Sequence, residues 1–408
     1  MAELHLLSPR GFIANGIYAG IKIRQTPDVG LLIAEAPASA AAAFTTNRVF
    51  AAPVKVGREH VAKGTLRGVV INSGNANACT GKQGEKDARR MCELAAAVAK
   101  CDCKAAEILP SSTGIIGHLL PMEKVERGII EAGQNLGASA EHALAFGDAI
   151  LTTDTKRKTA AAQFKIGKQT VTLAGICKGA GMIGPRVAVG AKAKQATMLA
   201  YLTTDAQIAP TVLRKLLQDA SDGSFNAVTI DDHMSTNDTA VILASGASGA
   251  KIAGPKAVKT FAAALAEVTQ SLAYQIAADG EGATKVVTVT ITGAKTPADA
   301  RLMARAVANS PLVKCAMHGN DPNWGRIVSA AGLAGAAFDP DKATLTLQGT
   351  VVFDKGTPTV IDAAAVSSAL KEKEVRVDLN CRLGKSSATV WTCDLSKEYV
   401  TINADYHT

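Results

Sequence analysis

Short apolar runs that end in glycine or asparagine turns alternate with helical segments along this 408-residue chain, and the alternation restricts it to layered sheets and helices. Residues 66–81, LRGVVINSGNANACTG, are typical of a buried strand that enters a polar loop. Residues 84–101 predict a helix, because acidic residues lead and Ala, Leu and Met recur at helical spacing. The first half therefore predicts a layered α+β or α/β sandwich.

The same patterns predict the elements that follow. Residues 196–202, ATMLAYL, are interpreted as a helix with Thr197 near its start, and a boundary near Gly280–Thr284 is expected to separate a C-terminal βαβ-like domain. Strands are expected over 106–117 (a strand that gives way to a loop), 169–179, 284–293, 374–382 and 387–395, with a hairpin over 343–357. Helices are expected over 122–136, 209–225, 256–282 and 296–317, the last with a pattern that stops before Pro311.

Composition narrows the class of protein. The length predicts two or three domains. Aromatic residues make up only 4% while Gly and Ala are abundant, so we expect layers that approach closely through small side chains. The net charge of +8 is compatible with small acidic substrates. The basic residues are scattered and no arginine tract interleaves with aromatics, so nucleic-acid binding is not expected.

The eight cysteines have no C-x-x-C spacing, and Cys101-Asp102-Cys103 lacks a second ligand pair nearby. Reduced cysteines in a cytoplasmic protein and no metal site are therefore expected. The N-terminus, MAELHLLSPRGFIANG, has no secretory pattern, and no run of about 18 apolar residues predicts a membrane span.

The segment CKGAGMIGP, residues 177–185, invites comparison with a phosphate-binding loop. In that loop the lysine follows the glycines and precedes Ser or Thr, whereas Lys178 stands before them here. The nucleotide-loop interpretation is therefore rejected.

Thr197 is the first candidate nucleophile. A threonine hydroxyl is weak unless a base takes its proton, and a threonine at a chain N-terminus can use its own α-amine as that base. That amine has a reference pKa of about 7.7–8.0. The small Ala196 before Thr197 suits self-cleavage by an N-to-O acyl shift. Judged by the residues alone, a threonine in the first turn of a helix is the simpler alternative.

Three further segments offer site candidates, each with a structural alternative. In SSTGIIG, residues 111–117, hydroxyls and backbone N–H groups can face a developing oxyanion, or the segment is an ordinary turn. Glu281 in ADGEGATK can meet an ammonium, or it ends a solvated helix. The tail NADYHT, residues 403–408, is either part of a site or a frayed end.

Together these motifs resemble one family over essentially the whole chain: the ornithine acetyltransferases, or bifunctional glutamate N-acetyltransferases, of arginine biosynthesis. The motifs that carry the resemblance are GFIANGIYAGIK (11–22), AFTTNRVFAAPV (43–54), NSGNANACTG (72–81), SSTGIIG, ILTTDT (150–155), CKGAGMIGP, ATMLAYLTTDA (196–206), MSTNDT (234–239), DGEGATK (279–285), ANSPLVKCAMHGNDPNWGRI (308–327) and INADYHT (402–408).

The resemblance implies an N-terminal-nucleophile-like αββα sandwich, of the type seen in DmpA and ornithine acetyltransferase, with a smaller C-terminal α/β domain. It implies self-cleavage between Ala196 and Thr197 into an α chain, 1–196, and a β chain, 197–408, assembled as α2β2. Residues 197–283 would complete the first domain and 284–408 would form the second.

The implied reaction moves acetyl from N2-acetylornithine to glutamate through acetyl-Thr197, without a cofactor, and some members also accept acetyl-CoA. By motif position, Thr113 and Gly114 match the oxyanion pair. The implied substrate-binding set is Thr152, Lys178, Thr197, Glu281, Asn403 and Thr408. Thr153 stands beside Thr152 in TTDT as the alternative to it, and Thr152 is chosen.

Two departures from the family pattern stand out. About two residues usually separate the proline of KGxGMIxP from ATM, whereas RVAVGAKAKQ, residues 186–195, intervenes here. It is either a loop that cleavage frees or a disturbance of the strain that drives cleavage. The family's VDGDxSTNDT reads IDDHMSTNDT, with Asp232 and His233 in the altered loop.

Two other functions stay open at this point. The first is an aminopeptidase or amidase that uses the same threonine on the same scaffold. The second is an uncleaved binding or regulatory protein, which the insertion suggests.

Overall fold

The computed structural model describes residues 3–189 and 198–405. They divide into two compact units: Met1–Asn226 with His233–Leu272, and Ala227–Asp232 with Ala273–His407. The division falls within helix α6 (Gly254–Ala278), whose last residues belong to the second unit.

The first unit is organised around one long strand, β2 (Val29–Phe44). The first part of β2 pairs antiparallel with β1 and β3, and the last part pairs with β9. The register against β3 shifts between Ile33 and Ala38, so the strand passes from one set of partners to another. The hydrogen-bonded order is β4-β3-β2-β9-β8-β6-β5, and β1 and β7 also pair with β2. The other strands are β1 (Phe12–Ile17), β3 (Thr65–Asn75), β4 (Ile108–Ile115), β5 (Lys158–Ile166), β6 (Gln169–Lys178), β7 (Ala188–Val189), β8 (Leu199–Thr204) and β9 (Thr239–Ala244).

Alternate side chains of β2 fill two different cores, as the two-residue period of a strand requires. Leu31 and Ile33 pack in one cluster with residues of helices α2 and α3. Leu32 packs on the opposite face with Phe146 of α4 and Tyr201 of β8, whose rings meet edge to face at 5.4 Å. The helices are α1 (Ala52–Val61), α2 (Gly81–Val98), α3 (Met122–Gln134), α4 (Ala140–Ala149), α5 (Pro210–Asp222) and α6.

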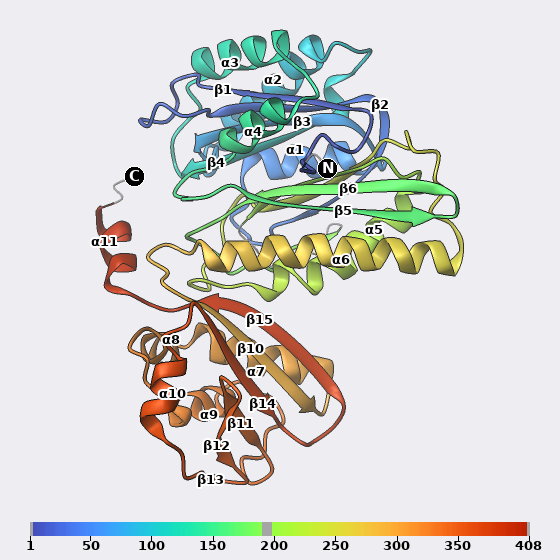
Figure 1. The fold of residues 1–408 in the computed structure, drawn as a ribbon. Coiled ribbons are helices and arrows are strands. Elements are labelled where there is room, and N and C mark those ends of the chain that lie inside the picture. Colours follow the sequence, from blue (N-terminus) through green and yellow to red (C-terminus); the bar gives the residue numbers. More distant parts are fainter. Residues whose placement is uncertain (1–2, 190–197, 406–408) are drawn as a thin grey trace. The chain divides into compact units, whose positions relative to one another are not determined.

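Helices α2 and α3 cover one side of this unit and α5 and α6 cover the other, with the sheet layers between them (Figure 1). The predicted layered sandwich of sheets and helices is therefore confirmed. Strand β4 continues through Thr113 and Gly114, so these residues lie at the end of a strand rather than in the loop after it.

The helix expected over ATMLAYL is wrong. Leu199–Thr204 forms strand β8, parallel to β9 and antiparallel to β6, with every residue buried. A short apolar run that is buried on both faces of a sheet shows neither the helical nor the alternating period, so its neighbours decide its conformation. Thr197, expected near the start of that helix, lies outside the described residues.

The second unit contains a mixed sheet in the order β13-β12-β11-β14-β10-β15, in which only β10 and β14 pair in parallel among the described residues. Its core includes alternate residues of β10, Val287, Val289 and Ile291, packed with Met303 and Val307 of α7. The strands are β10 (Val286–Ala294), β11 (Thr344–Leu347), β12 (Thr350–Asp354), β13 (Thr357–Pro358), β14 (Glu374–Asn380) and β15 (Ser386–Cys393). The helices are α7 (Pro297–Asn309), α8 (Pro311–His318), α9 (Trp324–Gly332), α10 (Ala363–Ala369) and α11 (Lys397–Asp405).

The expected hairpin over 343–357 is confirmed as β11 and β12. The helical pattern expected to stop before Pro311 is also confirmed, because α7 ends at Asn309 and α8 begins at Pro311. No helix among the described residues is both long enough and apolar enough to cross a bilayer.

Gly175 of β6 provides a test of the close approach between sheet and helix. A Cβ there would lie 2.4 Å from Leu202 Cδ2 and 3.0 Å from Leu272 Cδ1 of α6. We expect Gly175→Ala to lower the free energy of unfolding by about 1–3 kcal/mol, measured by urea denaturation, because the added methyl overpacks a filled core.

The matched control is Gly223→Ala at the end of α5, where a Cβ has no neighbour nearer than 3.8 Å. Its free energy of unfolding should change by less than about 0.5 kcal/mol. Equal effects at the two glycines would contradict the packing argument.

Candidate active site

Thr113 and Lys178, to which the family resemblance assigns an oxyanion role and a substrate-binding role, meet in the first unit. Thr113 stands near the end of β4 and Lys178 is the last residue of β6. Both side chains are buried, and the Lys178 ammonium donates a hydrogen bond of 3.3 Å to Thr113 Oγ1. Because the hydroxyl oxygen accepts this bond, its proton stays available to a third group.

Gly114 follows Thr113 where β4 runs parallel to β3. Its φ is 132°, and a Cβ would lie 2.4 Å from the carbonyl carbon of Gly74 and 2.6 Å from the Asn75 nitrogen. Only glycine fits this backbone-to-backbone contact. The predicted oxyanion pair therefore lies at a close backbone contact between β4 and β3.

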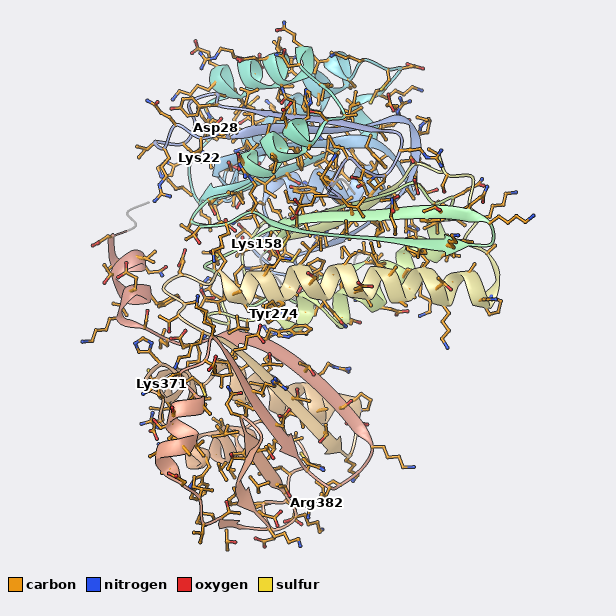
Figure 2. The ribbon with its side chains drawn as sticks, viewed as in Figure 1. Lys22, Asp28, Lys158, Tyr274, Lys371 and Arg382 are labelled. Atoms are coloured by element: carbon orange, nitrogen blue, oxygen red, sulfur yellow. The ribbon has the colours of Figure 1, made fainter. Side chains whose placement is uncertain are left out.

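A buried carboxylate, Asp154, organises the segment beside Lys178. Its Oδ1 accepts hydrogen bonds from Lys158 Nζ at 2.7 Å and from the Gly179 N–H at 2.6 Å. Its Oδ2 accepts one from the Thr152 N–H at 3.1 Å. The carboxylate thus joins the loop that contains the predicted residue Thr152 to the glycine turn that follows Lys178 (Figure 2 labels Lys158).

Electrostatics keep Asp154 ionised. Burial by itself raises the pKa of this carboxyl, but Lys178, Lys158 and the Gly179 N–H together outweigh burial and hold the pKa well below its usual range. Lys158 is the ion-pair partner of Asp154, whereas Lys178 donates to the neutral Thr113 hydroxyl. The cluster therefore has two cations and one anion.

Lys22 adds a further cation that the sequence analysis did not select. Burial lowers its pKa to about 8 despite the opposing charges of Asp28, Asp148 and Asp154, and Lys178 lowers it further. Its ammonium donates to the Leu151 carbonyl at 3.1 Å, and its backbone N–H donates to buried Asp28 at 3.0 Å. Figure 2 labels Lys22 and Asp28 in the first unit.

Asn237, just before β9, binds the backbone of β4, the strand that ends in the predicted oxyanion pair. Its side-chain amide donates to the Ser112 carbonyl at 2.8 Å and to the Ala76 carbonyl at 2.6 Å. The backbone that leads into Thr113 is therefore fixed by a side chain from the MSTNDT motif.

The second unit brings together two other predicted residues, Glu281 and Asn403. The Asn403 amide donates to Glu281 Oε2 at 2.8 Å and to the Tyr399 carbonyl at 2.9 Å. The backbone of α11 packs against Gly282, where a Cβ would lie 2.5 Å from the Tyr399 nitrogen. The C-terminal segment is therefore helical as far as Asp405 and held at Tyr399 and Asn403, which contradicts the alternative of a frayed end for the described residues.

Some predicted residues lie outside the described residues: Ala196, Thr197 and Thr408, together with 190–195 of the insertion. The start of the insertion is anchored. Ala188 and Val189 form β7 against β2, and the Val189 N–H donates to Gln218 Oε1 at 2.7 Å. In the altered loop, Asp232 forms an ion pair with Arg305 at 3.0 Å.

The sequence analysis missed the structural importance of Asp154, Lys158, Lys22 and Asp28. Asp154 stood inside the quoted motif TTDT, and Lys22 ended GFIANGIYAGIK, so the motifs contained the only signal. An ion pair buried by distant strands cannot be read from local periodicity.

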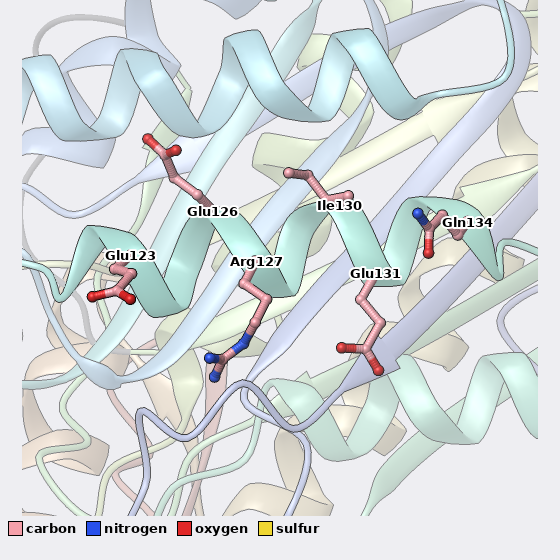
Figure 3. Close-up of a pocket in the computed structure, with 6 residues that line it drawn as sticks. All are labelled: Glu123, Glu126, Arg127, Ile130, Glu131 and Gln134. Carbon is pink, nitrogen blue, oxygen red and sulfur yellow. The ribbon is translucent and has the colours of Figure 1, made fainter.

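The residues that line a hollow on the surface of α3 do not form a catalytic or binding site (Figure 3). A single helix contributes all of its lining residues, and two of them are engaged elsewhere: Glu126 with Arg90 and Arg127 with the Ala19 carbonyl. The lining residues are Glu123, Glu126, Arg127, Ile130, Glu131 and Gln134. In the described part of the chain, no three His, Cys, Asp or Glu side chains group as metal ligands.

Comparison with known proteins assigns this chain to a family. The family model described as the ArgJ family matches residues 13–408. The chain belongs to the ArgJ family. The resemblance inferred from the motifs is therefore confirmed.

Curated relatives of this ArgJ-family chain extend over nearly its whole length. An arginine biosynthesis bifunctional protein ArgJ of Rhodopirellula baltica is 43% identical over 408 residues, covering 99% of this chain and 97% of the relative. The protein of the same name from Geobacter sulfurreducens is 45% identical over 405 residues, covering 98% and 100%. A crystal structure of ArgJ from Bacillus halodurans is 36% identical with a TM-score of 0.49, covering 50% of this chain and 97% of the other.

We expect Asp154→Asn to lower the free energy of unfolding at pH 7 by about 3 kcal/mol or more, because Lys158 loses its buried counter-ion. The folded-state pKa of Asp154 lies below its unfolded value of about 3.9, so its contribution is present above that value and is lost as pH falls. The wild-type curve should therefore decline from about pH 5 downward, and the variant should lack this part of the decline.

Urea unfolding between pH 3 and pH 7 measures both effects. Asp148→Asn is the matched control, because Asp148 pairs with Arg157 at an exposed position. It should cost less than about 1 kcal/mol. An unchanged acid slope in Asp154→Asn would contradict the assignment.

Proposed function

We propose that this chain is a self-cleaving acetyltransferase that moves the acetyl group of N2-acetyl-L-ornithine to L-glutamate through an acetyl-threonine intermediate. The observation that carries the proposal is membership of the ArgJ family over residues 13–408. The relatives at 43% and 45% identity are named arginine biosynthesis bifunctional proteins. The meeting of Thr113 with Lys178 supports an acyl-transfer site in this chain.

The nucleophile is Thr197 after cleavage of the Ala196–Thr197 bond. Its freed α-amine takes the hydroxyl proton as Oγ attacks the acetyl carbonyl, and the same proton passes to the departing amine of ornithine. The amine of glutamate then attacks the acetyl ester, and the threonine hydroxyl is restored. Two half-reactions that share one intermediate predict ping-pong kinetics.

Thr113 and Gly114 form the oxyanion hole in this proposal. Because Lys178 donates to Thr113 Oγ1, the hydroxyl proton is free to point at the developing negative charge. The nearby ammonium also polarises the hydroxyl and strengthens it as a donor. The close contact of Gly114 with Gly74 fixes the position of this backbone.

Substrate recognition uses charges of opposite sign. Lys178 attracts the substrate carboxylate as a point charge, and Glu281, oriented by Asn403, pairs with the ornithine ammonium. Thr152 and Thr408 complete the substrate set.

The reaction needs no cofactor, and acetyl-CoA serves as an additional donor in the bifunctional form. The α and β chains, 1–196 and 197–408, stay together as α2β2 in the cytoplasm and bind no nucleic acid.

We expect the wild-type chain to give two bands on a denaturing gel, with the C-terminal band beginning Thr-Met-Leu-Ala. Thr197→Ala should leave one band and no acetyl transfer, because it removes both the attacking hydroxyl and the source of the nucleophile. A wild-type chain that stays intact and still transfers acetyl groups would contradict the mechanism. Acetate release that does not need glutamate would instead favour the amidase function.

We expect Thr113→Val to reduce kcat for acetyl transfer by about 10²–10³-fold, because it deletes one oxyanion donor while preserving shape. Thr260→Val on α6 is the matched control and should leave kcat unchanged, because Thr260 is half-buried and its hydroxyl donates to the Lys256 carbonyl of its own helix. Steady-state kinetics with acetylornithine and glutamate measure both variants. A Thr113→Val enzyme with wild-type kcat would remove Thr113 from the oxyanion hole.

A further inference from the structure

The peptide group that joins Leu151 to Thr152 is held at both of its polar atoms. Its N–H, which belongs to Thr152, donates to Asp154 Oδ2 at 3.1 Å. Its carbonyl oxygen, which belongs to Leu151, accepts a hydrogen bond of 3.1 Å from the Lys22 ammonium. Because a peptide group is planar, these two bonds fix its orientation and limit the directions open to the Thr152 side chain.

Lys22 reaches this peptide group from a turn that is itself fixed. Buried Asp28, the residue before β2, accepts hydrogen bonds from the N–H groups of Ala19 and Ile21, each at 2.7 Å. Asp28 also accepts the Lys22 N–H at 3.0 Å. Hydrogen bonds to a charged acceptor are stronger than those to a neutral one, so the backbone from which the Lys22 side chain extends is held firmly.

The stem of Lys22 also contacts the strand beside the oxyanion glycine. A Cβ on Gly74 of β3 would lie 3.0 Å from Lys22 Cγ, and Gly74 is the residue whose backbone meets Gly114. The neighbouring Ser73 hydroxyl donates to the Ala149 carbonyl at the end of α4, at 2.7 Å. Lys22 therefore connects β3 to the loop that follows α4, and all of these residues belong to the first unit.

The carboxylates around Lys22 are bound by other groups. Asp148 accepts a hydrogen bond from Arg157 Nη2 at 2.7 Å, and Asp154 accepts one from Lys158 Nζ at 2.7 Å. The Lys22 ammonium instead donates to backbone carbonyls just beyond the C-terminal end of α4, where a positive charge is favourable. Its charge therefore stabilises the loop rather than a carboxylate.

We propose that Lys22 is a positioning residue for acetyl transfer, which holds the loop of Thr152 at a fixed position relative to the oxyanion strands. The inference rests on the proposed function, because it assumes that Thr152 contacts the substrate. Lys22 acts through this loop and does not touch the reacting atoms. Loss of its ammonium releases the Leu151 carbonyl, so that Thr152 leaves the position in which the substrate binds.

Lys22→Met tests this role, because methionine fills the space of the stem and lacks the ammonium. We expect kcat/KM for N2-acetylornithine to fall by about tenfold, since a charge-assisted hydrogen bond is lost. The fall should come from a higher KM with little change in kcat, because the loop serves substrate binding rather than the chemical step.

Lys124→Met is the matched control. The Lys124 ammonium of α3 donates to the Gly20 carbonyl at 2.6 Å, in the same turn as Lys22 but at an exposed position. The change removes the same charge and the same kind of hydrogen bond without reaching the loop of Thr152. It should leave kcat/KM within about twofold of wild type.

A double variant tests the route through Thr152. Thr152→Ala by itself should also lower kcat/KM for N2-acetylornithine. If Lys22 acts through Thr152, the two losses overlap, and the enzyme with both changes should be no slower than Thr152→Ala. Losses that multiply in the double variant would show that Lys22 acts independently of Thr152 and would overturn the proposal.

The pH profile of the wild-type enzyme provides a second test. Burial lowers the pKa of Lys22 to about 8, and Lys178 lowers it further. The charges that oppose this shift are those of Asp28, Asp148 and Asp154. Above about pH 8 the ammonium loses its proton and its hydrogen bond weakens, so kcat/KM should fall there. The Lys22→Met enzyme should lack this fall.

A folded Lys22→Met enzyme, verified by circular dichroism and thermal melting, with kcat/KM within about twofold of wild type would overturn the proposal. If this variant does not fold, the wild-type profile decides, and a kcat/KM that does not fall above pH 8 overturns it. Absence of acetyl transfer by the wild-type chain would instead overturn the proposed function, and the role of Lys22 with it.

Discussion

The ion pair between Asp154 and Lys158 is the interaction on which the first unit's candidate site depends. Two charges are taken out of water, which is tolerated because the carboxylate also accepts the N–H groups of Gly179 and Thr152. These bonds fix the glycine turn after Lys178 and the loop before β5 relative to one another. The direction in which Lys178 meets Thr113 therefore follows from a buried charge that does no chemistry itself.

Close contacts at small residues are the second constraint on the packing of the first unit. The contact of Gly114 with Gly74, and that of Gly175 with the side chains of β8 and α6, exist only because no Cβ intervenes. A chain with few aromatic residues packs its layers through such contacts, and close layers bring the ends of β3, β4 and β6 together. Close packing is thus the physical origin of the polar cluster as well as of the fold.

Polar groups without ordinary partners gather at this same edge. The Lys178 ammonium donates to the neutral hydroxyl of Thr113. The geometric criteria for hydrogen bonds find no partner for either carboxyl oxygen of buried Asp238 among the described residues. Each arrangement lowers the free energy of unfolding. Proteins keep such unfavourable arrangements mainly at functional sites. In the proposed mechanism Lys178 serves acyl transfer.

The sequence by itself determined the fold class, most element boundaries and the family, because amphipathic periods, glycine turns and ordered motifs are local properties. It also selected Thr113, Lys178, Glu281 and Asn403 as candidates, and the structure brings them together in pairs. Only the tertiary structure decided that Leu199–Thr204 is a strand, since a run buried on both faces takes its conformation from its neighbours. The same holds for the burial of Asp154 and its bond to the Gly179 N–H, because they depend on residues distant in the chain, although its ion-pair partner Lys158 is only four residues away.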